Sequence, residues 1–499
     1  MAVNSLRPLK PRDFDYWKAH HLLNRAGFGG TPDQVQALAS MGLDDAVDYI
    51  VEYESIGDDA MPTDRWSADI MRPPTAEEQE TARTARRNSD EATLERLQRE
   101  RNQRQAADRK QMADIQKWWI RRMIETGRPL EEKMTLFWHG HFATSYRTIE
   151  DSWHMVLQNQ FLRANATGSF AKLCFGIIRD PAMLEYLDND QNRRRSPNEN
   201  LARELMELFI LGEGHDYTEQ DIKEGARALT GYTFRDDAFV FNRREHDDGQ
   251  KRILGKTGSF DGEDFVRLVL ARPVASEFIA WKLYRFFVND LPGTPDKDTQ
   301  GFIVKLAKEM RDRDYQLKPV LRALFRSEHF YDPDNTAALI KSPVQLVVQA
   351  IRSMRTPARD LSALAAASDL MGQNLFFPPN VKGWDGGRAW INTSTLFVRQ
   401  NIIVYLLTGK RPNTYAWQED DAVYDPTHLL AHLPSLDGGP PPVRDATTYL
   451  LRFMLGSDPR PERVDGLVAF VERNGGRIDT NVATALVAVI AAFTEYQLC

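Results

Sequence analysis

Polar side chains of one short helical segment have the types and spacing for acid–base chemistry. Side chains three and four residues apart share one side of a helix, and here they are Asn200, Arg203, Glu204 and Glu207. Leucines occupy another side of the same segment. Two carboxylates on the wall of a cavity could bind a cation or exchange protons with a substrate. From residue types alone, a solvated face with an Arg203–Glu207 ion pair is the more frequent outcome.

A second segment, residues 132–145, sets two imidazoles among aromatic and charged residues. His139 and His141 would face the same side of an extended strand, but nearly opposite sides of a helix. Histidine titrates near neutral pH, so imidazoles beside carboxylates could act as acid and base. Metal binding is a weak interpretation, because the only conceivable third ligand is His154, at no fixed offset. Histidines beside aromatic residues are more often hydrogen-bonded core residues.

The loop before the polar helix matches part of the calcium-loop pattern. Oxygen ligands at positions one, three, five and twelve can surround one hard cation, and here those positions hold Asp188, Asp190, Asn192 and Glu199. The sixth position is Arg193 where the pattern requires glycine, and two further arginines follow it. A turn and a capping box, with Ser196 as N-cap and Glu199 three residues later, explain the same residues more simply. A divalent cation such as calcium is therefore the minority interpretation.

Residues 376–392 form a third segment with binding potential. Two prolines and three glycines around Trp384 and Trp390 predict an ordered, irregular loop. Lys382 and Trp384 could bind an anion or a sugar by charge and stacking. The simpler interpretation is that the tryptophans anchor this loop to the helical core.

Composition and missing motifs exclude several classes of protein. No phosphate-binding or dinucleotide-binding glycine motif and no zinc-protease or serine-hydrolase motif is present, so we expect no nucleotide cofactor. The net charge of −7 provides no overall attraction to nucleic acid, so we expect no nucleic-acid partner. The longest apolar stretch, residues 482–493, is too short to span a membrane. Without an apolar signal segment near the N-terminus, the default expectation is a cytoplasmic protein.

The elements that must position these residues read as helices. Long stretches of helical periodicity, punctuated by glycine and proline, predict an all-α, multi-helix globular array with long ordered loops. We expect an N-terminal tail (1–19), a helical core (20–407), a linker rich in proline and glycine (408–443) and a helical tail packed on the core (444–499). Residues 75–126 contain neither glycine nor proline, and residues 98–111 contain no large apolar side chain. The charged insertion, 75–111, is therefore a solvated helix, a charged hairpin or a partly disordered segment.

Several of these motifs occur together, in order, in one known family. AHHLLNRAGFGGTPDQVQAL, EKMTLFWHGHFATS, SPNENLARELMELFILGEG, YTEQDIKEGARALTGYTF and PPNVKGWDGGRAWIN resemble the bacterial family called domain of unknown function 1800. The resemblance runs from about residue 20 to residue 401, and the closing TEYQLC is similar to planctomycete members. That family has no established activity to transfer.

The resemblance favours a cavity wall over a solvated face as the interpretation of the polar helix. Its motifs include a set of matching polar residues: His139, His141, Asn198, Glu199, Asn200, Arg203, Glu204 and Glu207. It therefore implies a polar pocket, with the histidines, Arg203, Glu204 and Glu207 as catalytic groups. Asn198, Asn200, Lys382 and Trp384 would bind a substrate. The expected function is hydrolysis or modification of an anionic or polysaccharide substrate.

The alternative is a non-catalytic accessory or scaffold protein. Family members are often encoded beside domain of unknown function 1501 proteins, which resemble sulfatases or phosphatases. The resemblance thus implies such a protein as a partner, and export together with it is an open alternative to the cytoplasm.

Overall fold

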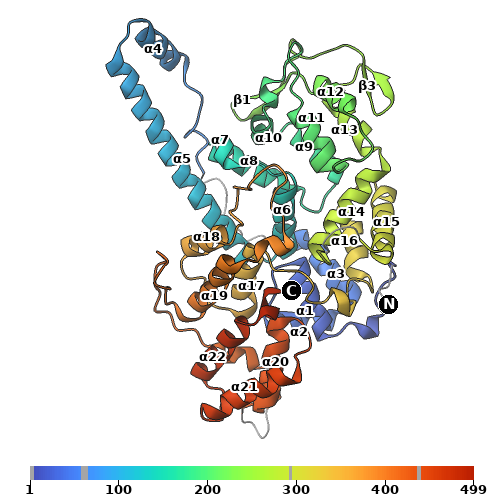
Figure 1. Ribbon diagram of the computed structural model, residues 1–499, viewed down its shortest axis with the longest axis vertical. Helices are drawn as coiled ribbons and strands as arrows, with labels where there is room; N and C mark the ends of the chain where they lie inside the picture. Colours follow the sequence, from blue (N-terminus) through green and yellow to red (C-terminus); the bar gives the residue numbers. More distant parts are fainter. Residues whose placement is uncertain (1–4, 58–65, 291–294, 435–439) are drawn as a thin grey trace.

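Residues 5–57, 66–290, 295–434 and 440–499 are described by the computed structural model (Figure 1). Helices make up most of this part of the chain, and its only strands are two short hairpins. The prediction of a mainly helical array is confirmed. The predicted tail and linker fall partly outside the described residues, at 1–4 and 435–439.

Three helices open the chain. They are α1 (Tyr16–Ala26), α2 (Pro32–Met41) and α3 (Leu43–Val51), flanked by the short turns η1 (Pro11–Asp13) and η2 (Tyr53–Ser55). At the start of α2, Thr31 accepts a hydrogen bond from the backbone of Gln34, whose side chain accepts one from the Thr31 backbone. This capping box and Pro32 at the first helical position are local sequence signals that fix the start of α2.

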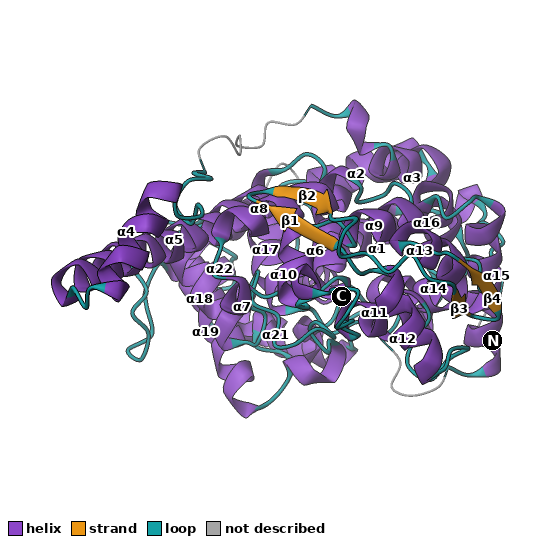
Figure 2. Ribbon diagram, turned by 90° about the horizontal axis from the view of Figure 1, so that it is seen from above, coloured by secondary structure: helices purple, strands orange, loops and turns teal. Residues whose placement is uncertain are grey.

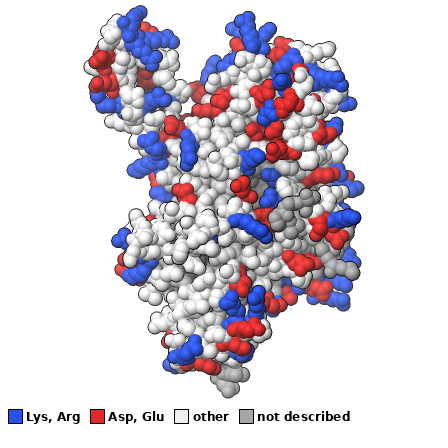
Figure 3. All heavy atoms as spheres, in the orientation of Figure 1, with Lys and Arg blue, Asp and Glu red and all other residues white. Residues whose placement is uncertain are grey.

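A charged helical hairpin projects from the body of the molecule (Figure 1). It consists of α4 (Ala76–Arg87) and α5 (Glu91–Glu125), and of the three sequence alternatives it matches the charged hairpin. No residue of α5 before Asp108 is buried, whereas Asp108 and eight later residues, Trp118 and Trp119 among them, are. The outer half carries both signs of charge (Figure 3), which suits a solvated helix.

The middle of the chain holds α6 (Pro129–His141), α7 (Tyr146–Ile149), α8 (Ser152–Ala164), α9 (Phe170–Ile177), α10 (Pro181–Tyr186), η3 (Asn189–Gln191), α11 (Asn200–Glu204), the π-helical turn η4 (Leu205–Ile210) and α12 (Glu219–Ala228). The predicted N-cap at Ser196 is wrong, because α11 begins only at Asn200. The reason is tertiary: the buried Asn192 side chain accepts a hydrogen bond from the Asn198 backbone and donates to the Ala226 carbonyl. The residues between are thereby held in a turn. By contrast, α12 begins where the sequence has a local signal, the capping box of Thr218 and Asp221.

Two antiparallel hairpins follow. Strands β1 (Tyr232–Arg235) and β2 (Ala238–Phe241) pair with Thr233 opposite Val240, and β3 (Lys251–Ile253) and β4 (Lys256–Gly258) pair with Arg252 opposite Thr257. In Figure 2, β3 and β4 lie at the edge of a body formed by helices, whereas β1 and β2 lie over the middle of the view.

The remaining helices complete the body. They are α13 (Gly262–Leu270), α14 (Pro273–Phe287), α15 (Lys297–Asp312), α16 (Leu317–Arg326), η5 (Pro333–Asn335), α17 (Pro343–Met354), α18 (Leu361–Leu370), η6 (Gly387–Trp390), α19 (Thr393–Thr408), η7 (Pro426–Leu430), α20 (Val443–Leu455), α21 (Pro461–Arg473), α22 (Thr480–Ala491) and η8 (Thr494–Gln497). None of the helices in the described part is both long and apolar enough to cross a lipid bilayer.

The two helices α6 and α17 are the most enclosed elements. Each has eleven buried residues, so polar groups on every side of them must find partners inside the protein. The last residues of the chain return to this centre, where Leu339 and Cys499 exchange both backbone hydrogen bonds (2.9 and 3.3 Å). Arg399, fully buried on α19, donates to the Gln497 side chain there.

Candidate functional site

The two histidines of α6 point into different surroundings. Because the segment is a helix, residues two apart face nearly opposite sides. His139 packs on Trp119 and Phe376, whereas His141 packs between Phe137 and Phe142. They therefore belong to two separate groups of polar residues and do not form a joint metal site.

His139 belongs to a closed, largely buried polar network. The Arg163 guanidinium donates to Asn159 Oδ1 (2.6 Å), which leaves Asn159 Nδ2 to donate to His139 Nε2 (2.9 Å). Arg163 and Arg122 both donate to the Glu132 carboxylate, which is 0% exposed. Burial lowers the pKa of His139 to about 3, so its imidazole is neutral. These contacts tie α6 to α5 and α8.

His141 keeps one ring nitrogen free. Its Nε2 lies 2.9 Å from the Phe209 carbonyl, which can only accept, so Nε2 carries the proton and Nδ1 the lone pair. Nδ1 is buried and has no hydrogen-bond partner among the described residues. Burial, with the nearby Lys282 charge, holds the pKa of His141 well below its usual value. A neutral imidazole with a fixed tautomer and an unused acceptor is suited to receiving a proton.

His141 lines a cavity of about 330 Å³ between α6, α14 and the 373–390 loop, here called the α6–α14 cavity. Lys133 and Gly140 of α6, Lys282 and Arg285 of α14, and Lys382 and Trp384 of the loop also line it. The Trp384 indole nitrogen is buried without a hydrogen-bond partner among the described residues. The irregular loop, Lys382 and Trp384 thus lie where residues 376–392 predicted a binding segment.

Glycines allow the loop to approach the helices. Gly383 has φ +82°, and a Cβ there would lie 2.0 Å from the Gly140 carbonyl oxygen. A Cβ on Gly387, at φ +51°, would lie 2.1 Å from the Asp290 carboxylate, which accepts from Arg285 (2.6 Å). Larger residues at either position would push the loop away and open the cavity.

The cavity wall is rich in lysine. Burial lowers the pKa of Lys133, Lys282 and Lys341 to about 8 each. Lys133 donates to the Gln345 side chain, Lys341 donates to the Tyr496 carbonyl, and Cys499 partly opposes the effect of burial on both. Lys282 lies over the Phe278 ring and has no hydrogen bond or ion pair with the described residues. Lys282 is therefore the cation most available to a ligand.

The polar helix forms a surface network beside this cavity. Arg203 pairs with Glu207 (3.2 Å), Glu199 (3.1 Å) and Glu219 (2.8 Å), and its side chain is 30% exposed. Burial and Glu207 raise the pKa of Glu204, while Arg203 and Lys382 lower it. Glu204 is thus close enough to Lys382 of the cavity wall to interact electrostatically. The structure does not bring Arg203 and Glu207 into contact with His139, and their predicted catalytic roles stay predictions.

The remaining predicted residues lie in the loop before α11. Asn198 Oδ1 accepts from the Asn200 backbone (2.9 Å), and Asn200 Nδ2 lies 3.5 Å from the Asp188 carboxylate. The Asn192 amide is fully buried and bonded to the protein, and Glu199 pairs with Arg203. Neither Asp188 nor Asp190 has an ion-pair partner here, and the latter is half-buried. Within the described ranges, no group of three or more His, Cys, Asp or Glu side chains is arranged to hold a metal ion. The calcium loop stays a minority prediction.

Sequence reasoning missed Lys133, Lys341 and the half-buried Lys282. A signal for two of them exists: Lys282 stands inside the apolar helix FIAWKLYRFF, and Lys133 precedes the apolar run MTLFW. A lysine enclosed by apolar neighbours on a helix must bury or extend its ammonium group, and such lysines change pKa readily. The clustering of all three was not visible, because they come from α6, α14 and the loop before α17.

Fold and cavity define the class: a helical protein with an enclosed, lysine-rich pocket. A family model described as "Protein of unknown function (DUF1800)" matches residues 21–498, so the chain belongs to that family, as the sequence motifs predicted. Neither the curated proteins nor the solved structures contain a match to this chain.

Proposed function

We propose that this protein is an enzyme that hydrolyses or otherwise modifies an anionic substrate, such as a charged polysaccharide, in the α6–α14 cavity. The observation that carries the proposal is the pairing of an available cation, Lys282, with an unused acceptor, His141 Nδ1, on one cavity wall. Together they can hold a negative charge and receive a proton from the group beside it.

Each group has a separate role in this proposal. Lys282 neutralises the anionic group of the substrate, and the Trp384 indole supplies a hydrogen-bond donor and an apolar face. His141 Nδ1 takes a proton from the attacking nucleophile. Burial is the main cause of the lowered pKa of His141, and the Lys282 charge is a smaller one. A bound anion would offset the Lys282 contribution alone and so raise the basicity of His141 in part.

Glu204 supplies a second proton-transfer group at the edge of the cavity. Its pKa is raised by burial, so its carboxyl holds a proton at higher pH than an ordinary glutamate does. This is the arrangement that a general acid requires. The Glu207 charge adds to this increase in the pKa of Glu204, and the Arg203 charge opposes it.

An activity screen with matched variants tests the enzyme proposal. Purified protein is assayed on chromogenic sulfate, phosphate and carboxylate esters and on charged oligosaccharides, and the assay is repeated for Lys282→Met, His141→Gln and Glu204→Gln. Lys308→Met removes an exposed lysine of α15 and serves as the control. Turnover that survives in the control and falls at least tenfold in Lys282→Met and His141→Gln supports the proposal. No turnover of any class, or turnover unchanged in both variants, contradicts it.

A second candidate function is that of a non-catalytic accessory protein. The observation that favours it is the network of His139, Glu132 and Arg163, which is closed and largely buried and so serves packing. In that case the partner would be a domain of unknown function 1501 protein encoded nearby. The protein would come from a planctomycete-like bacterium, and it would be located in the same compartment as its partner.

Co-purification distinguishes the two candidates. If the two proteins form a stable complex and the partner's sulfatase or phosphatase activity rises equally with wild-type and Lys282→Met protein, the accessory function is supported. Substrate turnover by this chain alone would rule that function out as its sole role.

A further inference from the structure

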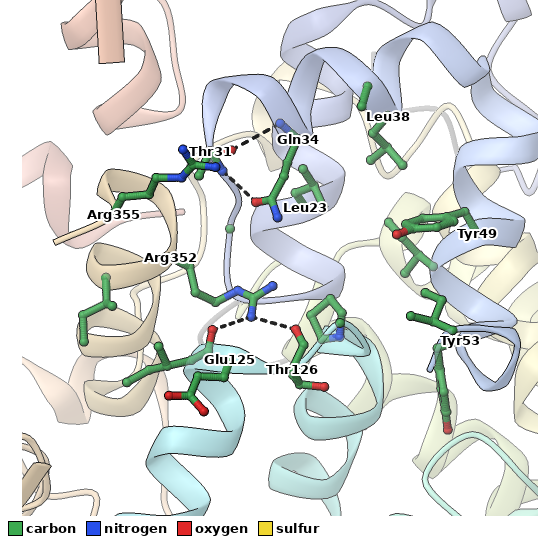
Figure 4. A pocket seen from close by; sticks show the side chains of 18 of the residues that line it. Leu23, Thr31, Gln34, Leu38, Tyr49, Tyr53, Glu125, Thr126, Arg352 and Arg355 are labelled. Carbon is green, nitrogen blue, oxygen red and sulfur yellow. Dashed lines mark hydrogen bonds between the residues drawn. The ribbon is translucent and has the colours of Figure 1, made fainter. Parts of the chain in front are cut away.

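A second cavity, of about 540 Å³, lies where α2, α3, the α5–α6 junction and the end of α17 meet (Figure 4). We call it the α2–α17 cavity. It shares no lining residue with the α6–α14 cavity. Its volume lies within the usual range for small-molecule sites, about 300–1,000 Å³. The proposed function does not use it.

Most of its wall is apolar. Leu23, Leu38, Ile50 and Ile351 line it, and Met41 and Tyr49 extend the apolar surface to its rim. Met41 is 40% and Tyr49 48% exposed, which is unusual for large apolar side chains. Solvent-exposed apolar side chains that continue into a cavity indicate a binding site rather than a random surface feature.

Two arginines lie at one side of the α2–α17 cavity: Arg352 in α17 and Arg355 at the C-cap of that helix. In Figure 4, Arg352 and Arg355 enter from the side opposite Leu38 and Tyr49. Arg352 donates to the carbonyls of Ile124 (2.8 Å) and Thr126 (3.0 Å) and so closes the wall. Arg355 is exposed and forms no ion pair with any described residue. The one carboxylate of the lining is that of Glu125.

Unused polar atoms accompany these arginines. Thr356, 5% exposed, lines the cavity and its hydroxyl has no hydrogen-bond partner in the described part of the chain. The Arg352 Nε is likewise buried without a hydrogen-bond partner in the described part of the chain. Buried polar atoms normally find a partner, so a hydroxyl and a guanidinium nitrogen left unused beside a cavity point to a polar group of a ligand.

The backbone at Arg355 is strained. Arg355 caps the C-terminus of α17 with φ +53°, in the left-handed region that favours glycine or asparagine. A long charged residue at such a position is disfavoured for folding. Strain of this kind is retained where the side chain is needed in a fixed place.

We propose that the α2–α17 cavity binds a free, single-chain amphiphile with an anionic head, its carboxylate at Arg355 and Thr356 and its alkyl chain against Leu38 and Ile50. The apolar wall accounts for the chain, and the unpaired Arg355 accounts for the charge. The site is independent of the α6–α14 cavity, so an experiment can contradict this proposal without contradicting the proposed enzyme function, and the reverse.

Binding of dodecanoate to the full-length protein, by calorimetry below the micelle concentration, tests this proposal. The wild type should bind one equivalent saturably, dodecanol at least tenfold more weakly, and acetate not detectably. Arg355→Asn should weaken dodecanoate binding at least tenfold, leave dodecanol binding unchanged, and leave the melting temperature equal or higher, since asparagine tolerates the left-handed conformation.

Three further variants sharpen the result. Arg355→Lys should restore most of the affinity, because it restores the charge. Ala37→Trp should fill the cavity and abolish binding of both ligands, and Arg460→Asn, which removes an exposed cation elsewhere, should change nothing. Equal dodecanoate binding by wild type and Arg355→Asn would overturn the proposal. So would equal affinity for dodecanol, or binding only to anionic phospholipid vesicles.

Discussion

At the scale of single residues, the chemistry of this protein depends on ammonium groups that are taken out of water. Lys133, Lys282 and Lys341 sit on one cavity wall, and two of them have neutral oxygen partners instead of carboxylates. Removal of a cation from water favours its neutral form, and that is the cause of their lowered pKa values. A bound anion supplies the missing counter-charge and restores the protonated form.

This predicts a pH dependence of anion binding. Sulfate keeps its charge between pH 6 and 10, whereas Lys133, Lys282 and Lys341 lose their protons around pH 8. Affinity for sulfate should therefore be highest below about pH 7 and fall about tenfold between pH 8 and 9. Calorimetric titration at several pH values measures this. Lys282→Met should bind weakly at every pH, Lys308→Met should follow the wild type, and a wild-type affinity that is constant across the range would contradict the assignment.

At the scale of elements, α5 is one continuous helix whose two halves differ in burial. The buried residues of α5 all lie in its inner half, from Asp108 onward, and the helix as a whole packs on α4, α6, α8, α17 and α18. The outer half is held by ion pairs such as Arg104–Glu78 (3.0 Å) and Arg96–Glu100 (2.7 Å). Exposed pairs of this kind contribute little, about 0.3–0.5 kcal/mol each.

Truncation of one apolar residue in each half should therefore give different results. Ile115→Ala, in the inner half at 0% exposure, should lower the free energy of unfolding by about 2–4 kcal/mol through lost burial and a cavity. Leu97→Ala, in the partly exposed outer half, should lower it by less than about 1 kcal/mol, since alanine also favours the helix. Urea denaturation measures both values. Equal losses would show that the outer half is packed as firmly as the inner half.

At the scale of the whole molecule, distant parts of the chain share one centre. The Tyr424 hydroxyl, in the predicted linker, donates to the Met354 carbonyl (2.6 Å), and Trp417 nearby is buried. Arg25 of α1 donates to the carbonyls of Val288 and Asn335. In Figure 1 the C-terminus lies in the middle of the view, away from α20–α22. These ties join the C-terminal helices to the core.

We therefore expect the chain to unfold in one cooperative transition. Leu346→Ala on α17 and Leu450→Ala on α20, both buried, should each lower the midpoint of the same transition, by about 2–5 kcal/mol in free energy. Circular dichroism and tryptophan fluorescence should report coincident midpoints. Two transitions, with only one of them shifted by Leu450→Ala, would show that α20–α22 fold as a separate unit.

The sequence by itself determined the local features of this protein. Helix starts at Thr31 and Thr218 and the irregular loop around Trp384 were predictable, because capping and glycine or proline placement act within a few residues. For the charged segment the sequence left three alternatives open, of which the hairpin was one. The start of α11 was not predictable: the sequence indicated Ser196 as the N-cap, but the helix begins at Asn200. The buried side chain of Asn192, which accepts a hydrogen bond from the Asn198 backbone, decides where that helix begins.

The tertiary structure alone decided what surrounds each side chain. It separated His139, in a closed network, from His141, on a cavity wall, and it brought Lys282 and Lys341 from distant segments to that wall. It also left Arg355 without an ion pair at a second cavity. Burial and electrostatic neighbours depend on packing between segments far apart in the chain, and a spacing pattern carries no information about them.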